Sequence, residues 1–213
     1  MSSLIFATDE TQAFIATDTL ATSVDGEPAF FTTKALAVPH LRMLMAGTGV
    51  GGFLGRWFIQ VSDRMVIKGI DNLDYHTPKG LGLLWQTYKG EYSIPDDCTT
   101  TVYHFGFSEE EGLIHSYAYR SVNNFRSESL QYGLGVKPEG KIPEPYQFPT
   151  DIRSIMDSQR AIQATRPKQE RVYIGGEIII HHLTEQSLTI YPWDAFEDYE
   201  ANEQAIYDNF NKR

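Results

Sequence analysis

Three side chains near the N-terminus have types and spacing that suit hydrolytic chemistry. Ser2, Asp18 and Lys34 are separated by two equal intervals of sixteen residues. A serine hydroxyl is a weak nucleophile that needs a base, and an α-amino group, with an ordinary pKa of about 7.7–8.0, titrates near working pH. Removal of Met1 would create that base on Ser2. Lys34 would then stabilise the developing alkoxide, and Asp18 would keep Lys34 charged and oriented.

Two glycines offer a place for the oxyanion of such a reaction. Gly47 and Gly49 follow the apolar run 41–45 and precede an amphipathic segment that begins near Phe53. Backbone N–H groups at the start of a helix point toward negative charge and stabilise it. We therefore expect Gly47 and Gly49 to contribute to catalysis as oxyanion donors.

The same glycines also fit a different class of protein. Gly47, Gly49 and Gly52 satisfy G-x-G-x-x-G, and Asp71 lies nineteen residues beyond Gly52, as in a dinucleotide-binding fingerprint. Hairpin-like strand pairs precede this pattern and no βαβ unit follows it, so the nucleotide-binding interpretation is disfavoured.

A metal or redox site is not expected. Adjacent strand residues such as His181 and His182 point to opposite faces and do not easily ligate one ion. Cys98 is the only cysteine, which excludes an intrachain disulfide and a cysteine-cluster metal site. No cofactor is predicted.

The chain that must position these residues contains strands and helices in an order that does not alternate. Apolar and β-branched runs predict strands, and apolar residues at intervals of three and four predict helices. The expected strands cover 4–8, 13–17, 29–33, 34–38, 41–45, 100–107 and 113–121, with a closing hairpin from Val172 to Ile190. The expected helices cover 53–65, 81–88 and 151–164, with a terminal acidic helix packed through Trp193, Phe196, Tyr199, Tyr207 and Phe210.

This order favours antiparallel sheets flanked by helices rather than a doubly wound parallel sheet. With 213 residues, 41% of them hydrophobic, the chain has enough apolar material for one substantial core. We predict a single domain over residues 1–213, of the α+β class.

Local motifs around the three spaced residues resemble those of proteasome β-type subunits and the bacterial two-component proteasome-like protease. The resemblance is carried by Ala16–Thr22 around Asp18, by Thr32-Thr33-Lys34, and by Met45-Ala46-Gly47 followed by Thr48-Gly49. It implies an Ntn-hydrolase-like four-layer αββα sandwich, with Ser2 as the nucleophile of amide or peptide bond hydrolysis. It also implies that Ala21, Thr22, Met45 and Ala46 line a small to medium apolar substrate pocket.

The late part of the chain departs from that family's pattern. Arg171 and Ile174 stand where relatives carry an aspartate and a serine ahead of paired glycines, here Gly175-Gly176. Leu134, between Gly133 and Gly135, stands where a further serine is usual. These departures remove polar groups near the terminal amine, so a catalytically inactive scaffold or binding protein remains the alternative to a working hydrolase.

The net charge and the first residues of the chain indicate which partners and which location to expect. The formal net charge of −10 disfavours nucleic acid and anionic membrane surfaces, which require clustered Lys and Arg. The first residues resemble neither a signal peptide nor a membrane span, which predicts a cytoplasmic protein. A peptide or small amide is the expected substrate, and the family resemblance predicts a homo-oligomer.

Overall fold

The computed structural model describes residues 3–23 and 25–211, in which ten strands form two antiparallel five-stranded sheets. The first sheet has the order β10 (Gly133–Lys137), β1 (Leu4–Thr8), β2 (Gln12–Asp18), β11 (Glu177–Thr184), β12 (Leu188–Ala195). The second sheet has the order β5 (Ala35–Val38), β6 (Met43–Gly49), β7 (Thr100–Phe107), β8 (Ile114–Arg120), β9 (Ser127–Ser129).

The remaining elements cover or connect these sheets. A small two-stranded ribbon pairs β3 (Leu20–Thr22) with β4 (Pro28–Phe31). The helices are α1 (Phe53–Arg64), α2 (Ile70–Tyr92), α3 (Ile152–Ala164) and α4 (Tyr199–Phe210). Short 3₁₀ turns lie at Pro39–Leu41, Ser121–Asn123 and Lys168–Glu170.

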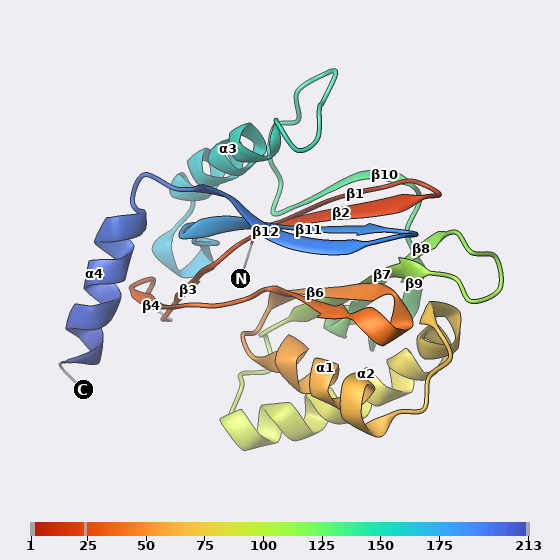
Figure 1. Cartoon of the computed structure of the whole chain (residues 1–213). Coiled ribbons are helices and arrows are strands. Elements are labelled where there is room, and N and C mark those ends of the chain that lie inside the picture. Colours follow the sequence, from red (N-terminus) through yellow and green to blue (C-terminus); the bar gives the residue numbers. More distant parts are fainter. Residues whose placement is uncertain (1–2, 24, 212–213) are drawn as a thin grey trace.

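Figure 1 shows four layers, with α3 outside the first sheet and α1 and α2 outside the second. Three hydrophobic clusters fill the spaces between these layers. Leu4, Ile15 and Phe105 belong to the cluster between the sheets, and Ile5 and Ile155 belong to the one under α3. Because successive strand residues point to opposite faces, Leu4 and Ile5 can supply two different cores. The predicted αββα sandwich is confirmed.

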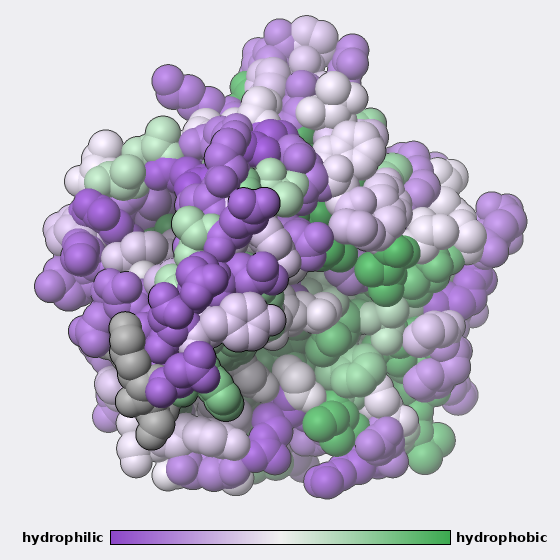
Figure 2. All heavy atoms as spheres, turned by 60° about the vertical axis from the view of Figure 1, so that its left-hand side comes forward, coloured by the Kyte–Doolittle hydropathy of each residue, from purple (hydrophilic) through white to green (hydrophobic). Residues whose placement is uncertain are grey.

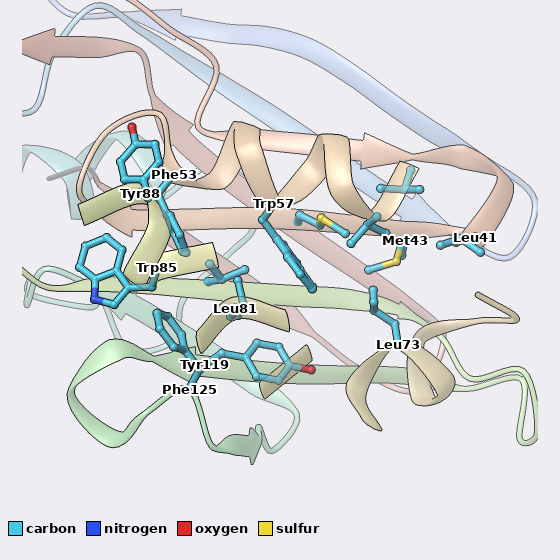
Figure 3. Packing of buried hydrophobic residues seen from close by; sticks show 14 residues of the cluster. Leu41, Met43, Phe53, Trp57, Leu73, Leu81, Trp85, Tyr88, Tyr119 and Phe125 are labelled. Carbon is cyan, nitrogen blue, oxygen red and sulfur yellow. The ribbon is translucent and has the colours of Figure 1, made fainter. Parts of the chain in front are cut away.

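The third cluster lies between the second sheet and helices α1 and α2 (Figure 3). Phe53, Trp57 and Val61 are buried on one stripe of α1, as their spacing of four residues predicts. The Phe53 ring meets Trp85 of α2 edge-on, with 5.0 Å between centroids. This packing fixes the start of α1 at the end of β6.

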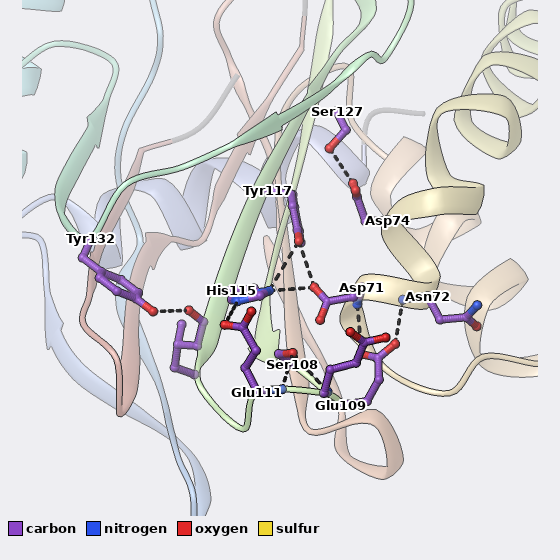
Figure 4. Close-up of polar contacts among 12 residues, drawn as sticks. Asp71, Asn72, Asp74, Ser108, Glu109, Glu111, His115, Tyr117, Ser127 and Tyr132 are labelled. Atoms are coloured by element: carbon purple, nitrogen blue, oxygen red, sulfur yellow. Dashed lines mark hydrogen bonds and ion pairs between the residues drawn. The ribbon is translucent and has the colours of Figure 1, made fainter.

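Helix α2 begins eleven residues before the predicted position, because its start is stabilised by a distant turn (Figure 4). Glu109, between β7 and β8, accepts hydrogen bonds from the N–H groups of Asp71 and Asn72 at 3.0 and 2.7 Å. These N–H groups have no partner within the helix, and a carboxylate there also interacts favourably with the helix dipole. Pro78 lies inside α2. Because proline usually breaks a helix, the local sequence does not predict a helix that continues through this residue.

Several other elements differ from the sequence expectation. Strands β9 and β10 were not predicted, and 172–174 form irregular chain rather than the first part of the closing hairpin. Trp193 belongs to β12 instead of the terminal helix, and no residue of α4 is buried. Helix α4 lies at one end of the sheets beside β4, where Tyr199 stacks on Phe31 with 5.0 Å between ring centroids.

Candidate functional site

Asp18, the last residue of β2, is fully buried and connects three segments of the chain. Its Oδ1 accepts a hydrogen bond from the Ser3 N–H at 2.9 Å and an ion-pair contact from Lys34 Nζ at 2.8 Å. Its Oδ2 accepts a hydrogen bond from the Gly175 N–H at 3.1 Å. A buried carboxylate is tolerated when it is paired and hydrogen-bonded in this way.

Lys34 lies immediately before β5 and only 7% of its side chain is exposed. Besides Asp18, its Nζ donates to the Leu20 carbonyl oxygen at 2.6 Å. An ammonium group has three donors, and two of them are used by these partners within the described part of the chain. The structure therefore brings Asp18 and Lys34 together, as the family resemblance implies.

Ser2 lies outside the described residues, so its predicted role as nucleophile stays a prediction. Its neighbour Ser3 is buried and held on two sides. In addition to the Asp18 contact, the Ser3 hydroxyl donates to Gln159 Oε1 at 2.6 Å, and Gln159 Nε2 donates to the Pro138 carbonyl oxygen at 2.6 Å. Sequence reasoning missed Gln159, because its partners lie on segments far from it along the chain.

A cavity of about 590 Å³, which we call the Lys34 cavity, opens beside this ion pair. Of the predicted site residues, its lining includes Ala21, Thr22, Lys34, Gly47 and Gly49. Phe30, Phe31 and Leu36 add apolar walls, and Leu54 and Gly55 from the first turns of α1 also line it. No side chain caps the N-terminus of α1, so orphan N–H groups and the positive end of the helix dipole lie at the cavity wall.

The two glycines predicted as oxyanion donors lie at the end of β6 in different backbone surroundings. The Gly47 N–H already donates to the Lys34 carbonyl oxygen at 3.2 Å, so an oxyanion would have to compete with this bond. Gly49 has φ of +105°, and a Cβ there would lie 2.2 Å from the Thr99 carbonyl oxygen. Only glycine can adopt this backbone without strain.

The structure corrects the placement of Met45 and Ala46. Both are fully buried: Met45 packs in the cluster under α1 and α2, and Ala46 packs between the sheets. They precede Gly47–Gly49, the end of β6 that reaches the Lys34 cavity, and the alternation of β6 directs them into the two cores. Neither residue belongs to the cavity lining.

The three residues that depart from the family pattern have partners of their own. The Arg171 guanidinium donates from Nε to the Arg166 carbonyl and from Nη2 to the Ala164 carbonyl, at 2.7 and 2.8 Å, near the end of α3. The Arg171 guanidinium thus caps carbonyl groups at the C-terminal end of α3. Ile174 packs in the core under α3. Leu134 pairs with Ala7, toward the far end of β1 from Ser3.

The alternative chemistries find no support in the geometry. Strand β6 runs antiparallel to both β5 and β7, whereas a dinucleotide fingerprint requires a parallel βαβ unit. Gly52 adopts φ of +80° before α1, and Asp71 pairs with His115 at 2.7 Å. Burial disfavours the His115 imidazolium, but Asp71 and Glu111 outweigh it and raise the His115 pKa.

The two adjacent histidines point to opposite sides of β11, as predicted. His181 is buried, whereas His182 stacks on Phe14 with 3.7 Å between ring centroids and contacts Gln12. Burial lowers the pKa of His181 to about 4. Within residues 3–23 and 25–211, no three His, Cys, Asp or Glu side chains are grouped so as to hold a metal ion, and no helix there is long and apolar enough to cross a membrane.

The two packed antiparallel sheets between helical layers form a proteasome-like sandwich, a fold related to that of the Ntn hydrolases. Two similar solved structures are Anbu (ancestral beta-subunit) from Yersinia bercovieri and an Anbu (Gly-1) mutant from Hyphomicrobium sp. strain MC1. Each has a TM-score of 0.60 and 13% sequence identity over 100% of this chain, covering 94% and 96% of the respective neighbours. No family model matches the sequence, and no curated protein is similar to it in sequence.

Proposed function

We propose that this chain is an N-terminal-nucleophile hydrolase that cleaves an amide or peptide bond with Ser2 after removal of Met1. The observation that carries the proposal is the buried Asp18–Lys34 ion pair at 2.8 Å, whose lysine lines the Lys34 cavity. Asp18 also binds the N–H of Ser3, the residue that follows Ser2. A buried pair costs desolvation energy, and its position between the N-terminal strand and a cavity suits the activation of a hydroxyl.

The chemistry would proceed through an acyl-enzyme. The Ser2 hydroxyl would attack the substrate carbonyl while its proton passes to the α-amino group of Ser2. Lys34 and the N-terminal turn of α1 would stabilise the negative charge that develops. The amine would leave with the transferred proton, and water would then hydrolyse the ester to release the acid and regenerate Ser2.

The cavity limits the substrate class. Apart from Lys34, its lining contains only neutral residues, among them Ala21, Phe31 and Leu36. Its volume of about 590 Å³ falls within the range of about 300–1,000 Å³ typical of small-molecule sites. We expect a neutral, mostly apolar group next to the scissile bond.

The test uses protein expressed without a tag, with intact mass showing whether the chain begins at Ser2. A β-lactone should then acylate wild-type protein, and Ser2→Ala should abolish the adduct. Lys34→Ala should lower the labelling rate by about 10²–10³-fold, the effect of losing one preorganised oxyanion-stabilising group. Asp18 acts through Lys34, so its replacement should lower the rate less. Lys79→Ala, an exposed lysine on α2, is the matched control.

A catalytically inactive scaffold is the second candidate function, and one observation favours it. Position 171 carries a guanidinium bound to the end of α3 and position 174 an apolar side chain in the core, so neither supplies a polar group to a terminal amine. Absence of an adduct on a verified Ser2 terminus, or equal labelling of Lys34→Ala, would decide for the scaffold.

A further inference from the structure

A half-buried lysine at the end of β10 lies beside the start of β1. Lys137 is the last residue of β10 and pairs with Leu4, which is two residues from Ser2 in the sequence. Gln159, which holds the Ser3 hydroxyl, also binds the carbonyl group that follows Lys137. The backbone around Lys137 is thus tied to the start of the strand that leads from the predicted nucleophile.

The side chain of Lys137 points into the space between the two sheets, which lie one above the other in Figure 1. Leu4 packs in the cluster between the sheets, and paired residues of neighbouring strands point to the same face. Lys137 Nζ accordingly reaches β7, where it donates to Thr101 Oγ1 at 3.2 Å. Thr101 is opposite Thr48 of β6, and Thr48 lines the Lys34 cavity.

The order of the strands places Lys34 and Lys137 on opposite sides of the end of β6. The second sheet runs β5, β6, β7, β8. Lys34 immediately precedes β5, whereas Lys137 lies over β7. Strand β1, which leads from Ser2, packs against β6 between them. A substrate whose acyl part fills the Lys34 cavity would therefore extend its amine part toward Lys137.

The charge of Lys137 is not compensated within the described part of the chain. Arg120 of β8, opposite Thr101, pairs with Glu128 at 2.9 Å. Among residues 3–23 and 25–211, however, no Asp or Glu oxygen lies within 4.0 Å of Lys137 Nζ. Burial and the charge of Arg120 lower the pKa of Lys137, while Glu128 raises it. An anion beside this ammonium would favour its charged form.

The cluster is accessible to a ligand, because Lys137 is only half-buried and the side chains of Arg120 and Glu128 are 32% and 35% exposed. One uncompensated ammonium matches one carboxylate. We propose that Lys137 binds a carboxylate on the amine part of the substrate. The preferred amide then joins a neutral, apolar acyl group to an amino acid or peptide that carries this carboxylate. Its assignment to the leaving-group side rests on the proposed hydrolysis.

Calorimetric titration of Ser2→Ala tests the proposal, because this variant cannot consume an amide through Ser2. The probes are N-hexanoylglycine, with a free α-carboxylate, the α-amide of N-hexanoyl-L-aspartate, with only a side-chain carboxylate, and neutral N-hexanoylglycinamide. At least one carboxylate should bind about tenfold or more tighter than the neutral amide, because charge-assisted hydrogen bonds are the stronger ones. The tighter carboxylate identifies its position in the substrate. Equal affinity for all three compounds, or no saturable binding, would overturn the proposal.

Matched variants in the Ser2→Ala background locate the site. Lys137→Met removes the charge and should abolish the preference for the carboxylate, whereas Lys137→Arg keeps the charge and should retain it. Lys141→Met makes the same change as Lys137→Met at an exposed position of the following loop and should leave the preference unchanged. A preference that is lost in Lys34→Met but survives Lys137→Met would place the carboxylate at Lys34 and contradict the assignment.

The carboxylate site and the hydrolase can fail separately. If a β-lactone labels Ser2 of the wild type but no probe shows a preference for the carboxylate, the hydrolase stands and the carboxylate site falls. If the β-lactone does not label Ser2, the titrations of Ser2→Ala and its Lys137 variants still decide whether Lys137 binds a carboxylate.

Discussion

Asp18 serves the fold as well as the candidate chemistry. Its carboxylate oxygens accept hydrogen bonds from Ser3 and Gly175 and pair with Lys34, so one side chain joins β1, the chain before β11 and the chain before β5. Replacing it leaves several buried donors without partners. Any loss of labelling in an Asp18 variant must therefore be compared with its loss of stability.

We expect Asp18→Ala to lower the free energy of unfolding by about 3–5 kcal/mol, because it leaves Lys34 as an uncompensated buried charge. Asp18→Ala combined with Lys34→Met should recover part of this loss, since the unpaired ammonium is then absent. Urea unfolding of the single and double variants measures both effects. A double variant less stable than Asp18→Ala alone would contradict the explanation.

His104 on β7 provides a test of burial through pH. Burial lowers the His104 pKa to about 3, and Trp57 Nε1–H donates to its Nε2 at 3.0 Å, so the folded protein holds the neutral ring. The unfolded chain takes up a proton near its ordinary pKa of about 6.5. Between about pH 6.5 and pH 3 the unfolded state thus binds more protons, and stability falls as pH falls, by about 1.4 kcal/mol per pH unit.

His104→Gln should flatten the pH dependence by about that slope while retaining an acceptor for Trp57. The exposed His76→Gln on α2 is the control and should leave the slope unchanged. Urea unfolding at several values between pH 7 and pH 4.5 measures the difference. Identical slopes in wild type and His104→Gln would contradict a neutral buried His104.

At the scale of elements, the start of α2 depends on the turn between β7 and β8. Glu109→Ala should destabilise the protein by about 0.5–2 kcal/mol, the usual cost of losing a helix N-terminal cap. Glu110→Ala changes the adjacent exposed carboxylate of the same turn and is the matched control. Urea unfolding at low ionic strength measures both variants, and equal losses would show that general charge rather than capping is responsible.

The contact of Glu109 with the start of α2 shows which structural features can be predicted from the sequence and which cannot. The hairpin of β1 and β2 and the stripe of α1 were predicted because they follow local periodicity, and the Asp18–Lys34 pair was predicted because its spacing resembles that of a known family. The first turns of α2 were missed because their cap, Glu109, is more than thirty residues away in the chain. The partners of Arg171 could not be predicted for a similar reason: the carbonyl groups at the end of α3 that it binds become apparent only in the folded chain.

At the scale of the molecule, α4 differs from the other helices. It buries none of its residues and lies beside β4 at one end of the sheets. A groove between them, which we call the α4 groove, is lined by apolar and aromatic side chains such as Phe30, Ile206, Tyr207 and Phe210, and by the polar residues Ser23, Asp25, Glu27 and Asn209. Figure 2 brings this end forward, and shows mainly hydrophilic residues on the left and hydrophobic residues gathered on the right. Exposed apolar side chains bordered by polar residues often mark an interaction site.

We expect the protein to form homo-oligomers through the α4 groove. Phe210 and Tyr207 are 75% and 60% exposed, so covering them by a second copy would remove apolar area from water without disturbing the monomer core. Phe210→Glu should therefore shift the mass measured by light scattering toward the monomer and leave thermal stability of the monomer unchanged. Leu83→Glu, on an exposed position of α2 with 60% exposure, is the control.

Salt dependence separates apolar association from charge pairing. The chain carries a net charge of −10, and Glu200, Glu203 and Asp208 add negative charge along α4 itself, so copies meeting through α4 repel one another. Salt screens this repulsion over about 8–10 Å at 0.10–0.15 M, and the oligomer should therefore become more stable as salt rises. A strict monomer at high protein concentration and high salt would refute self-association, and dissociation by Leu83→Glu instead of Phe210→Glu would move the contact to α2.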